Sequence, residues 1–306
     1  MARAGLITAT LLALAGGTSV SAQDSPIVVE GERESDASAR EAARAVVRNS
    51  GAIRGDRPIA RWRERLCVDV IGIEEPARAM VEQRILDFAE ALDLDARGKP
   101  GCRTNVSVAF TFDAAQLVET ARTRKPRTFR EVPSYHEAAL FGSEAPVRAW
   151  YRTGWRDRMG RAAAGQQLAS VSMDEPSWSG MLPNKDDAPI TSGSSKSRVQ
   201  TDGTRVIESA MIVIDRDLAA GYRVDDVADL VALHALAELY PRDTASDPNS
   251  VLALFETPAG EPRGGLSQCD WTLLEQLYAM PAARAGRFHR GALVRALAQA
   301  PDCAAG

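Results

Sequence analysis

The chain has 306 residues, of which 45% are hydrophobic and 25% are charged, and its formal net charge is −4. This mild acidity argues against a nucleic-acid partner, because proteins that bind nucleic acids concentrate positive charge on one face. The one strongly basic run, ARTRKPRTFR over residues 121–130, follows an expected helix. We interpret it as a solvated helix end and loop, with a site for an anionic ligand or surface as the alternative.

Residues 1–22 have the pattern of a secretory signal peptide. Arg3 precedes an apolar segment over residues 6–15, and VSA at residues 20–22 fits a cleavage site with small residues. The apolar segment is shorter than the roughly 20 residues that a membrane-spanning helix needs. No later stretch is long and uncharged enough to span a bilayer. We expect an exported, periplasmic or extracellular mature chain that begins at Gln23.

The next residues, 23–60, are polar and contain few aromatic side chains, although REAARAVVRNS over residues 40–50 has the pattern of a short helix. Segments of this composition bury little surface, so we expect a flexible N-terminal lead. A single α/β domain is expected over residues 61–306. Within it, residues 172–198 are rich in Ser, Pro, Gly and Asp and predict a long loop, either functional or disordered.

The first part of this domain has the pattern of a β-α-β-α unit. Apolar residues favour a strand over 68–73, and a helix is expected over 74–94, with Pro76 as a suitable first helical residue. Residues 106–112 alternate as a strand does, and Asp113 is a plausible N-cap for the helix that follows it. The crossover should be right-handed.

Later in the chain, RVIESAMIVID over residues 205–215 should add a strand to the same sheet. The predicted fold class is therefore α/β (α+β): a small mixed sheet with packed helices and a helical C-terminal region.

Four cysteines, an even number, in an exported chain predict two disulfides. We expect Cys67 to pair with Cys102, because these residues precede two strands that would start at the same edge of a parallel sheet. Cys269 and Cys303 bracket the C-terminal helices and are expected to form the second bridge.

A cluster of aromatic and arginine side chains lies in YHEAALFGSEAPVRAWYRTGWRDRMG, residues 135–160. Trp150, Tyr151, Arg152 and Trp155 could line a groove for a small ligand. The alternative is an edge strand or hairpin in which arginines lie over the aromatic rings. We favour the second interpretation.

Residues 227–241, VADLVALHALAELYP, predict a helix that starts after Asp225 or Asp226 and stops before Pro241. This helix is apolar on nearly every side, which indicates burial. His234 and Glu238 are one helical turn apart on the same side. They should bond to each other or to nearby backbone, or face a metal together.

After this helix come DPNSVLALF, then a helix capped by Ser267 that contains Asp270 and LEQLYAM, and a last helix in FHRGALVRALAQA. Together with LHALAEL at residues 233–239, this order resembles a group of exported bacterial proteins with a zincin-like (metallopeptidase-like) fold. The resemblance covers roughly residues 62–300 in the order of elements and is specific over 225–281. It implies a helix carrying residues of the H-E-x-x-H type.

The zinc motif is degenerate in this chain. Its first histidine matches His234, its glutamate falls on Ala235, and its second histidine falls on Glu238. In the longer pattern H-E-x-x-H-x-x-G-x-x-H, Pro241 replaces the glycine and Thr244 the third histidine. Alanine cannot act as a general base, and catalytic zinc normally has three protein ligands and a water. His234 and Glu238 are thus weak metal candidates, and we expect no catalytic residue and no cofactor.

Other catalytic and nucleotide-binding signatures, G-x-S-x-G, G-x-x-x-x-G-K-S/T and G-x-G-x-x-G, do not occur in the sequence. The sequence therefore favours a non-catalytic zincin-like domain that acts in binding or structure. Two alternatives remain open: a metal-dependent hydrolase that uses His234, Glu238 and a third ligand, or a small-ligand-binding protein that uses the segment around Trp150 and Trp155.

Overall fold

The computed structural model describes residues 34–96, 101–142, 144–157, 159–162, 201, 203–242, 248, 250–260, 263–300 and 303. The predicted signal peptide at 1–22 and the predicted loop at 172–198 lie outside the described residues. Residues 34–306 belong to one compact unit. Within the described ranges, no helix has the length and apolar character that crossing a membrane requires.

The unit is built on a four-stranded mixed sheet with the order β1-β2-β4-β3. Strands β1 (Val68–Ile71), β2 (Val106–Thr111) and β4 (Thr204–Asp215) are parallel, and β3 (Val147–Arg156) runs antiparallel to β4 at the edge. The predicted β-α-β unit and the predicted strand at 205–215 are confirmed. The α/β class with a small mixed sheet is therefore established.

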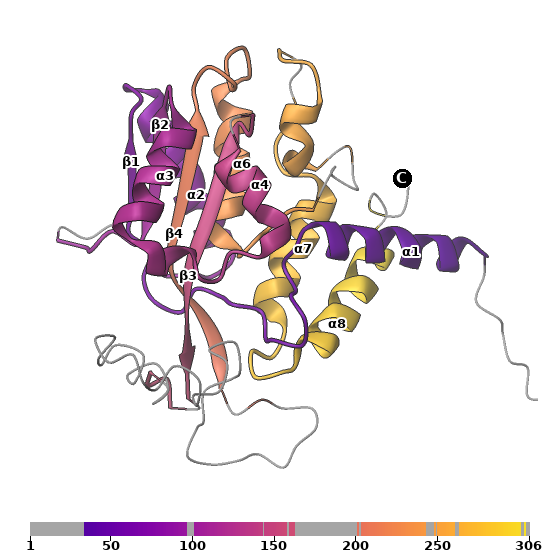
Figure 1. The fold of residues 1–306 in the computed structure, drawn as a ribbon. Helices are drawn as coiled ribbons and strands as arrows, with labels where there is room; N and C mark the ends of the chain where they lie inside the picture. The colour runs from indigo at the N-terminus through magenta and orange to yellow at the C-terminus, as the bar shows by residue number, and fades with distance from the viewer. Residues whose placement is uncertain are drawn as a thin grey trace, which may run out of the picture. The chain divides into compact units, whose positions relative to one another are not determined.

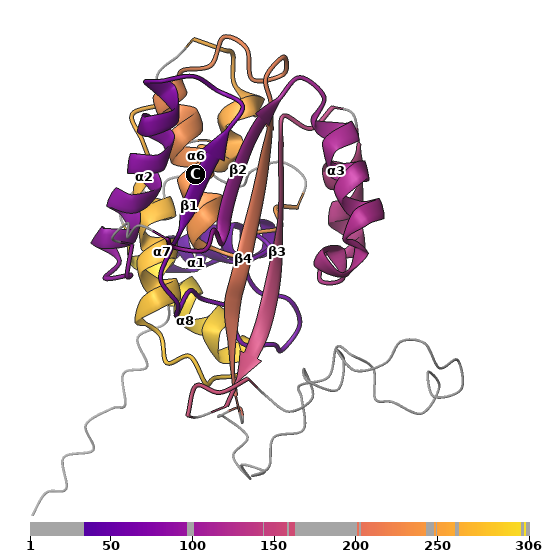
Figure 2. The same cartoon turned by 90° about the vertical axis from the view of Figure 1, so that its left-hand side faces the viewer.

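Helices cover both faces of the sheet (Figure 2). The crossover helix α2 (Ala77–Ala91) and α6 (Val224–Leu236) pack on one face. On the other face lie α3 (Ala114–Arg124), whose first turn is capped by Asp113 as predicted, and the short α4 (Glu137–Phe141). Two short 3-10 turns, Pro126–Phe129 and Ser134–His136, connect these two helices.

Helix α6 is the centre of the core. Its residues from Asp226 to Leu236 are all buried, as the apolar sequence predicted. Its end differs from the prediction, however: the helix stops at Leu236, and Ala237 has extended backbone (φ −136°, ψ 140°). The extended segment that follows remains buried through Tyr240.

The C-terminal region is helical, as expected. A 3-10 turn, Val251–Glu256, precedes α7 (Gln268–Ala279) and α8 (Gly286–Gln299). Ser267 caps α7: its side chain accepts from the Asp270 backbone, and the Asp270 carboxylate accepts in return from the backbone of Ser267. This reciprocal arrangement is a capping box, which satisfies N–H groups that a helix start otherwise leaves unpaired.

The expectation of a flexible lead over residues 23–60 is corrected for residues 34–60. Residues Glu34–Asn49 form helix α1, which packs against α8 (Figure 1). Ala43 and Val47 on α1, together with Ile59 after it, are buried in the core. The polar composition of this segment belongs to the exposed side of an amphipathic helix, so composition alone concealed its apolar stripe. Residues 23–33 lie outside the described residues.

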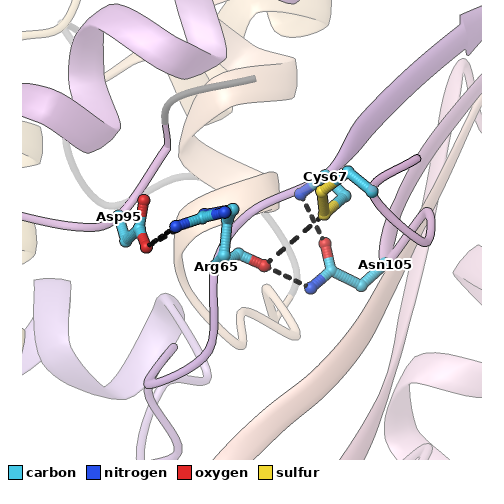
Figure 3. The surroundings of a disulfide bond; sticks show 5 residues. Arg65, Cys67, Asp95 and Asn105 are labelled. Atoms are coloured by element: carbon cyan, nitrogen blue, oxygen red, sulfur yellow. Dashed lines mark hydrogen bonds and ion pairs between the residues drawn. A yellow bond between two sulfur atoms is a disulfide. The ribbon is translucent and has the colours of Figure 1, made fainter. Parts of the chain in front are cut away.

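Both predicted disulfides are present, Cys67–Cys102 and Cys269–Cys303, with Cα atoms 5.9 and 5.3 Å apart. Beside the first bridge, the Asn105 side chain accepts from the Cys67 backbone N–H at 2.8 Å and donates to the Arg65 carbonyl at 2.8 Å (Figure 3). The bridge and this amide together fix the starts of β1 and β2 at one edge of the sheet.

A close backbone contact joins the end of α1 to the segment after α6. Gly51 has a φ of +65°, and a Cβ built there would lie 1.9 Å from the carbonyl oxygen of Tyr240. Only glycine combines this conformation with this approach. Gly55 has a similar φ of +59°, but a Cβ there would meet nothing within 4 Å.

We expect Gly51→Ala to lower the free energy of unfolding much more than Gly55→Ala does. Both substitutions strain a left-handed residue by about 1–2 kcal/mol, but only Gly51→Ala also forces two backbones apart, which adds about 2 kcal/mol or more. Urea unfolding of the two variants measures the difference. Equal losses would show that the contact at Gly51 is not tight.

Candidate functional site

The last carbonyl groups of α6 lie in the core, and side chains from three other parts of the chain donate hydrogen bonds to them. The Tyr151 hydroxyl donates to the His234 carbonyl at 3.0 Å, and the Trp62 indole N–H donates to the Ala235 carbonyl at 2.7 Å. The Tyr278 hydroxyl donates to the Leu236 carbonyl. The last carbonyls of a helix have no partner within the helix, so a helix can end inside a core only where such donors exist.

His234 lies in this buried region and is electrically neutral. Its Nδ1 is 3.2 Å from the Tyr151 hydroxyl oxygen. Because the single hydroxyl proton goes to the His234 carbonyl, we assign the ring proton to Nδ1, which then donates to that oxygen. Burial lowers the pKa of His234 to about 3, and nearby His136 lowers it further.

Glu238 lies beyond the end of α6 and is held by two arginines. Arg205 donates to both of its carboxylate oxygens, at 2.9 Å from Nη1 to Oε2 and 3.1 Å from Nη2 to Oε1. Arg54 donates to Oε1 as well. Burial by itself would raise the pKa of Glu238, but the two guanidinium groups outweigh burial and hold it below its usual value.

Of the alternatives stated for His234 and Glu238, the expectation that they bond to each other is therefore wrong. That expectation assumed that the helix continues to Tyr240, which would put both side chains on one side. The helix ends at Leu236 instead, and the extended Ala237 carries Glu238 toward the arginines. His234 turns to Tyr151.

Glu131 completes an ion network around Glu238. It accepts from Arg205 Nη2 at 2.7 Å, and it also pairs with Arg54 (3.5 Å) and Arg57 (3.8 Å). A metal cation at Glu238 would be repelled by Arg54 and Arg205, whose guanidinium groups lie against this carboxylate.

Among the described residues, no three His, Cys, Asp or Glu side chains are placed to hold a metal ion. His136 lies 3.3 Å from the Pro241 carbonyl, and His289 accepts from the Ile59 N–H at 3.2 Å through Nδ1. Thr244, at the position of the third zinc ligand, lies outside the described residues.

Trp150, Tyr151, Arg152 and Trp155 lie on the edge strand β3, as we favoured, but the described cation–π contacts do not involve these three aromatic rings. Trp150 is buried on the face covered by α3, where it stacks on Phe129 at 4.8 Å. Tyr151 is buried on the opposite face, toward α6. Arg152 is exposed and pairs with Glu208 at 3.2 Å, whereas Trp155 is partly buried. Alternation along the strand puts Trp150 and Tyr151 on opposite faces of the sheet, so these two side chains do not share a groove.

A cleft that sequence reasoning missed lies beside the end of α7. Its volume is about 430 Å³. The lining residues come from the segment before β1, the loop after α2, β4 and the end of α7: Arg61, Trp62, Arg63, Glu64, Asp93, Leu94, Asp95, Arg205, Tyr278 and Ala282. The run RWRER at residues 61–65 was the available signal, because it places one aromatic residue among four charged ones.

Comparison of the chain with protein-family models, curated proteins and solved structures gives no match.

We expect Glu238→Gln to lower the free energy of unfolding by about 3–5 kcal/mol, because it leaves Arg54 and Arg205 buried without their main counter-charge. The exposed pair Glu119–Arg122 provides the control, and Glu119→Gln should change stability little. A double variant, Arg205→Met with Glu238→Met, should lose less than the sum of its single changes. Denaturant unfolding measures all five variants, including the single changes Arg205→Met and Glu238→Met, and additive losses would show that the two residues do not act as a pair.

Proposed function

We propose that this chain is an exported, non-catalytic domain of zincin-like outline that acts by binding in the periplasm or outside the cell. The proposal rests on the ion pairs of Glu238. This carboxylate stands at the position of the second zinc ligand and is paired with Arg54 and Arg205. A metal ion would have to displace one of two guanidinium groups and then accept their repulsion.

Two further features support the absence of hydrolytic chemistry. Ala235 occupies the place of the general base, and its backbone carbonyl accepts from Trp62. His234, at the first ligand position, is 3% exposed and lies against Tyr151. A water molecule at this point would have no base to activate it.

Export is supported by the two disulfides together with the N-terminal sequence. Disulfides persist in oxidising compartments such as the bacterial periplasm and are rare in the cytosol. We expect the protein recovered from the cell envelope to begin at Gln23. Intact-mass measurement gives this directly, and a chain that retains Met1 in the envelope fraction would contradict the proposed signal peptide.

We expect the purified mature protein, after incubation with zinc and desalting, to contain far less than one zinc ion per chain. Elemental analysis measures this content. His234→Ala and the control His289→Ala should show the same low level as the parent. Stoichiometric zinc that is lost in His234→Ala and kept in His289→Ala would overturn the proposal and favour the metal-dependent hydrolase.

A further inference from the structure

Arg61 is buried but has no acidic partner in the described part of the chain. It is 6% exposed, and its Nε and Nη2 have no hydrogen-bond partner among the described residues. Burial lowers the pKa of Arg61 to about 10, because nothing nearby compensates fully for the lost hydration. Buried charges are ordinarily paired, so an unpaired buried arginine calls for a partner.

The backbone holds Arg61 firmly in this place. Residue 61 forms a parallel bridge with Val206, and its carbonyl accepts from the Ile207 N–H at 2.9 Å. Strand β4 pairs with β2 only from Ala210 onward, and residue 61 pairs with the part of β4 that precedes Ala210. The sheet therefore fixes the backbone from which the Arg61 side chain projects.

Arg61 also lines the cleft, and the charges around it are unequally compensated. Glu64 pairs with Arg156 at 3.1 Å, and Asp95 pairs with Arg65 at 2.7 Å. Arg205, a further lining residue, is neutralised by the ion network described above. Arg61, Arg63 and Asp93 are then the lining charges with no ion pair in the described residues. The uncompensated charge of the cleft is positive.

We propose that this cleft binds a small ligand through an oxyanion group, a carboxylate or a phosphate, with Arg61 as the buried anchor and Arg63 as a contact at the rim. The proposal rests on the proposed binding function and specifies the class of ligand. A guanidinium presents parallel N–H groups that match two oxygens of such an anion. Trp62 and Tyr278 supply the aromatic walls that small-ligand sites commonly have.

A purely structural role for Arg61 is the competing explanation. Its Nη1 donates to the carbonyls of Met280 and, at 3.4 Å, Tyr278, where α7 ends. A cation at the C-terminal end of a helix is favourable. This contact engages one of the three guanidinium nitrogens, so it accounts for the place of the side chain but not for the unpaired Nε and Nη2.

Binding of simple anions tests the proposal. The full mature chain is titrated calorimetrically with inorganic phosphate and, separately, with citrate, in chloride buffer of matched ionic strength. We expect saturable binding of at least one of the two anions, and the two arms show whether the site prefers phosphate or carboxylate. Arg61→Met should weaken this binding at least tenfold, and Arg63→Gln should weaken it less. The control Arg122→Gln removes an exposed, paired charge that does not line the cleft, and it should leave binding unchanged.

Stability in chloride buffer separates the ligand site from the helix cap. If Arg61 is held for a ligand, Arg61→Met should retain or raise the unfolding midpoint, because it removes an unpaired buried charge. A cap essential to α7 would instead lower the midpoint. Should Arg61→Met fail to fold, that failure supports the cap and counts against the proposal. In that case the anion affinity is measured with Arg61→Lys, which keeps the positive charge but loses the planar pair of N–H donors.

Absence of saturable binding to both anions, or equal binding by the parent and the Arg61 variants, would overturn the proposal. Neither result bears on the zinc content or the mature N-terminus. The proposed anion site and the proposed non-catalytic, exported role can therefore fail independently.

Discussion

The structure depends on how the C-terminal end of α6 is accommodated inside the core. A helix end exposes carbonyl groups that must be hydrogen-bonded, and burying them unpaired costs several kcal/mol. Here Tyr151, Trp62 and Tyr278 each donate to one of three consecutive carbonyls. These donors come from β3, from the segment before β1 and from α7, so the single helix end ties the sheet to both ends of the unit.

This arrangement also explains the fate of the residues that resemble a zinc motif. Ending α6 at Leu236 frees the next segment to extend, and Glu238 then reaches Arg54 and Arg205 instead of His234. The ion network that results is buried and well satisfied. Removing one member would leave another charged and unpaired, which is the costly case for buried ions. A position that could coordinate a metal on a longer helix thus serves to join the N-terminal segment to β4.

Two buried arginines on adjacent chain segments differ in a way that bears on function. Arg205 is surrounded by Glu238, Glu131 and Thr153, which occupy its guanidinium on several sides. Among the described residues, the Arg61 guanidinium donates to backbone carbonyls at the end of α7 and to no side chain. The first stabilises the fold through compensated charge, whereas the second keeps hydrogen-bonding capacity beside a cleft. Both arginines are buried, so burial does not distinguish them. They differ in how many guanidinium nitrogens have a hydrogen-bond acceptor.

The sequence by itself determined the features that rest on local periodicity. Alternation identified β2, helical spacing identified α2 and the buried α6, and the placement of Cys67 and Cys102 before two parallel strands identified their bridge. Composition misled at residues 34–60, because an exposed polar face outweighs a narrow apolar stripe in an average. Only the tertiary structure decided where α6 ends and what Glu238 binds. The deciding donors are distant in the chain, since Trp62 is 173 residues from Ala235 and Arg54 is 184 residues from Glu238. A helix can end inside a core only where hydrogen-bond donors reach its last carbonyl groups. The sequence around α6 does not show whether such distant donors are present.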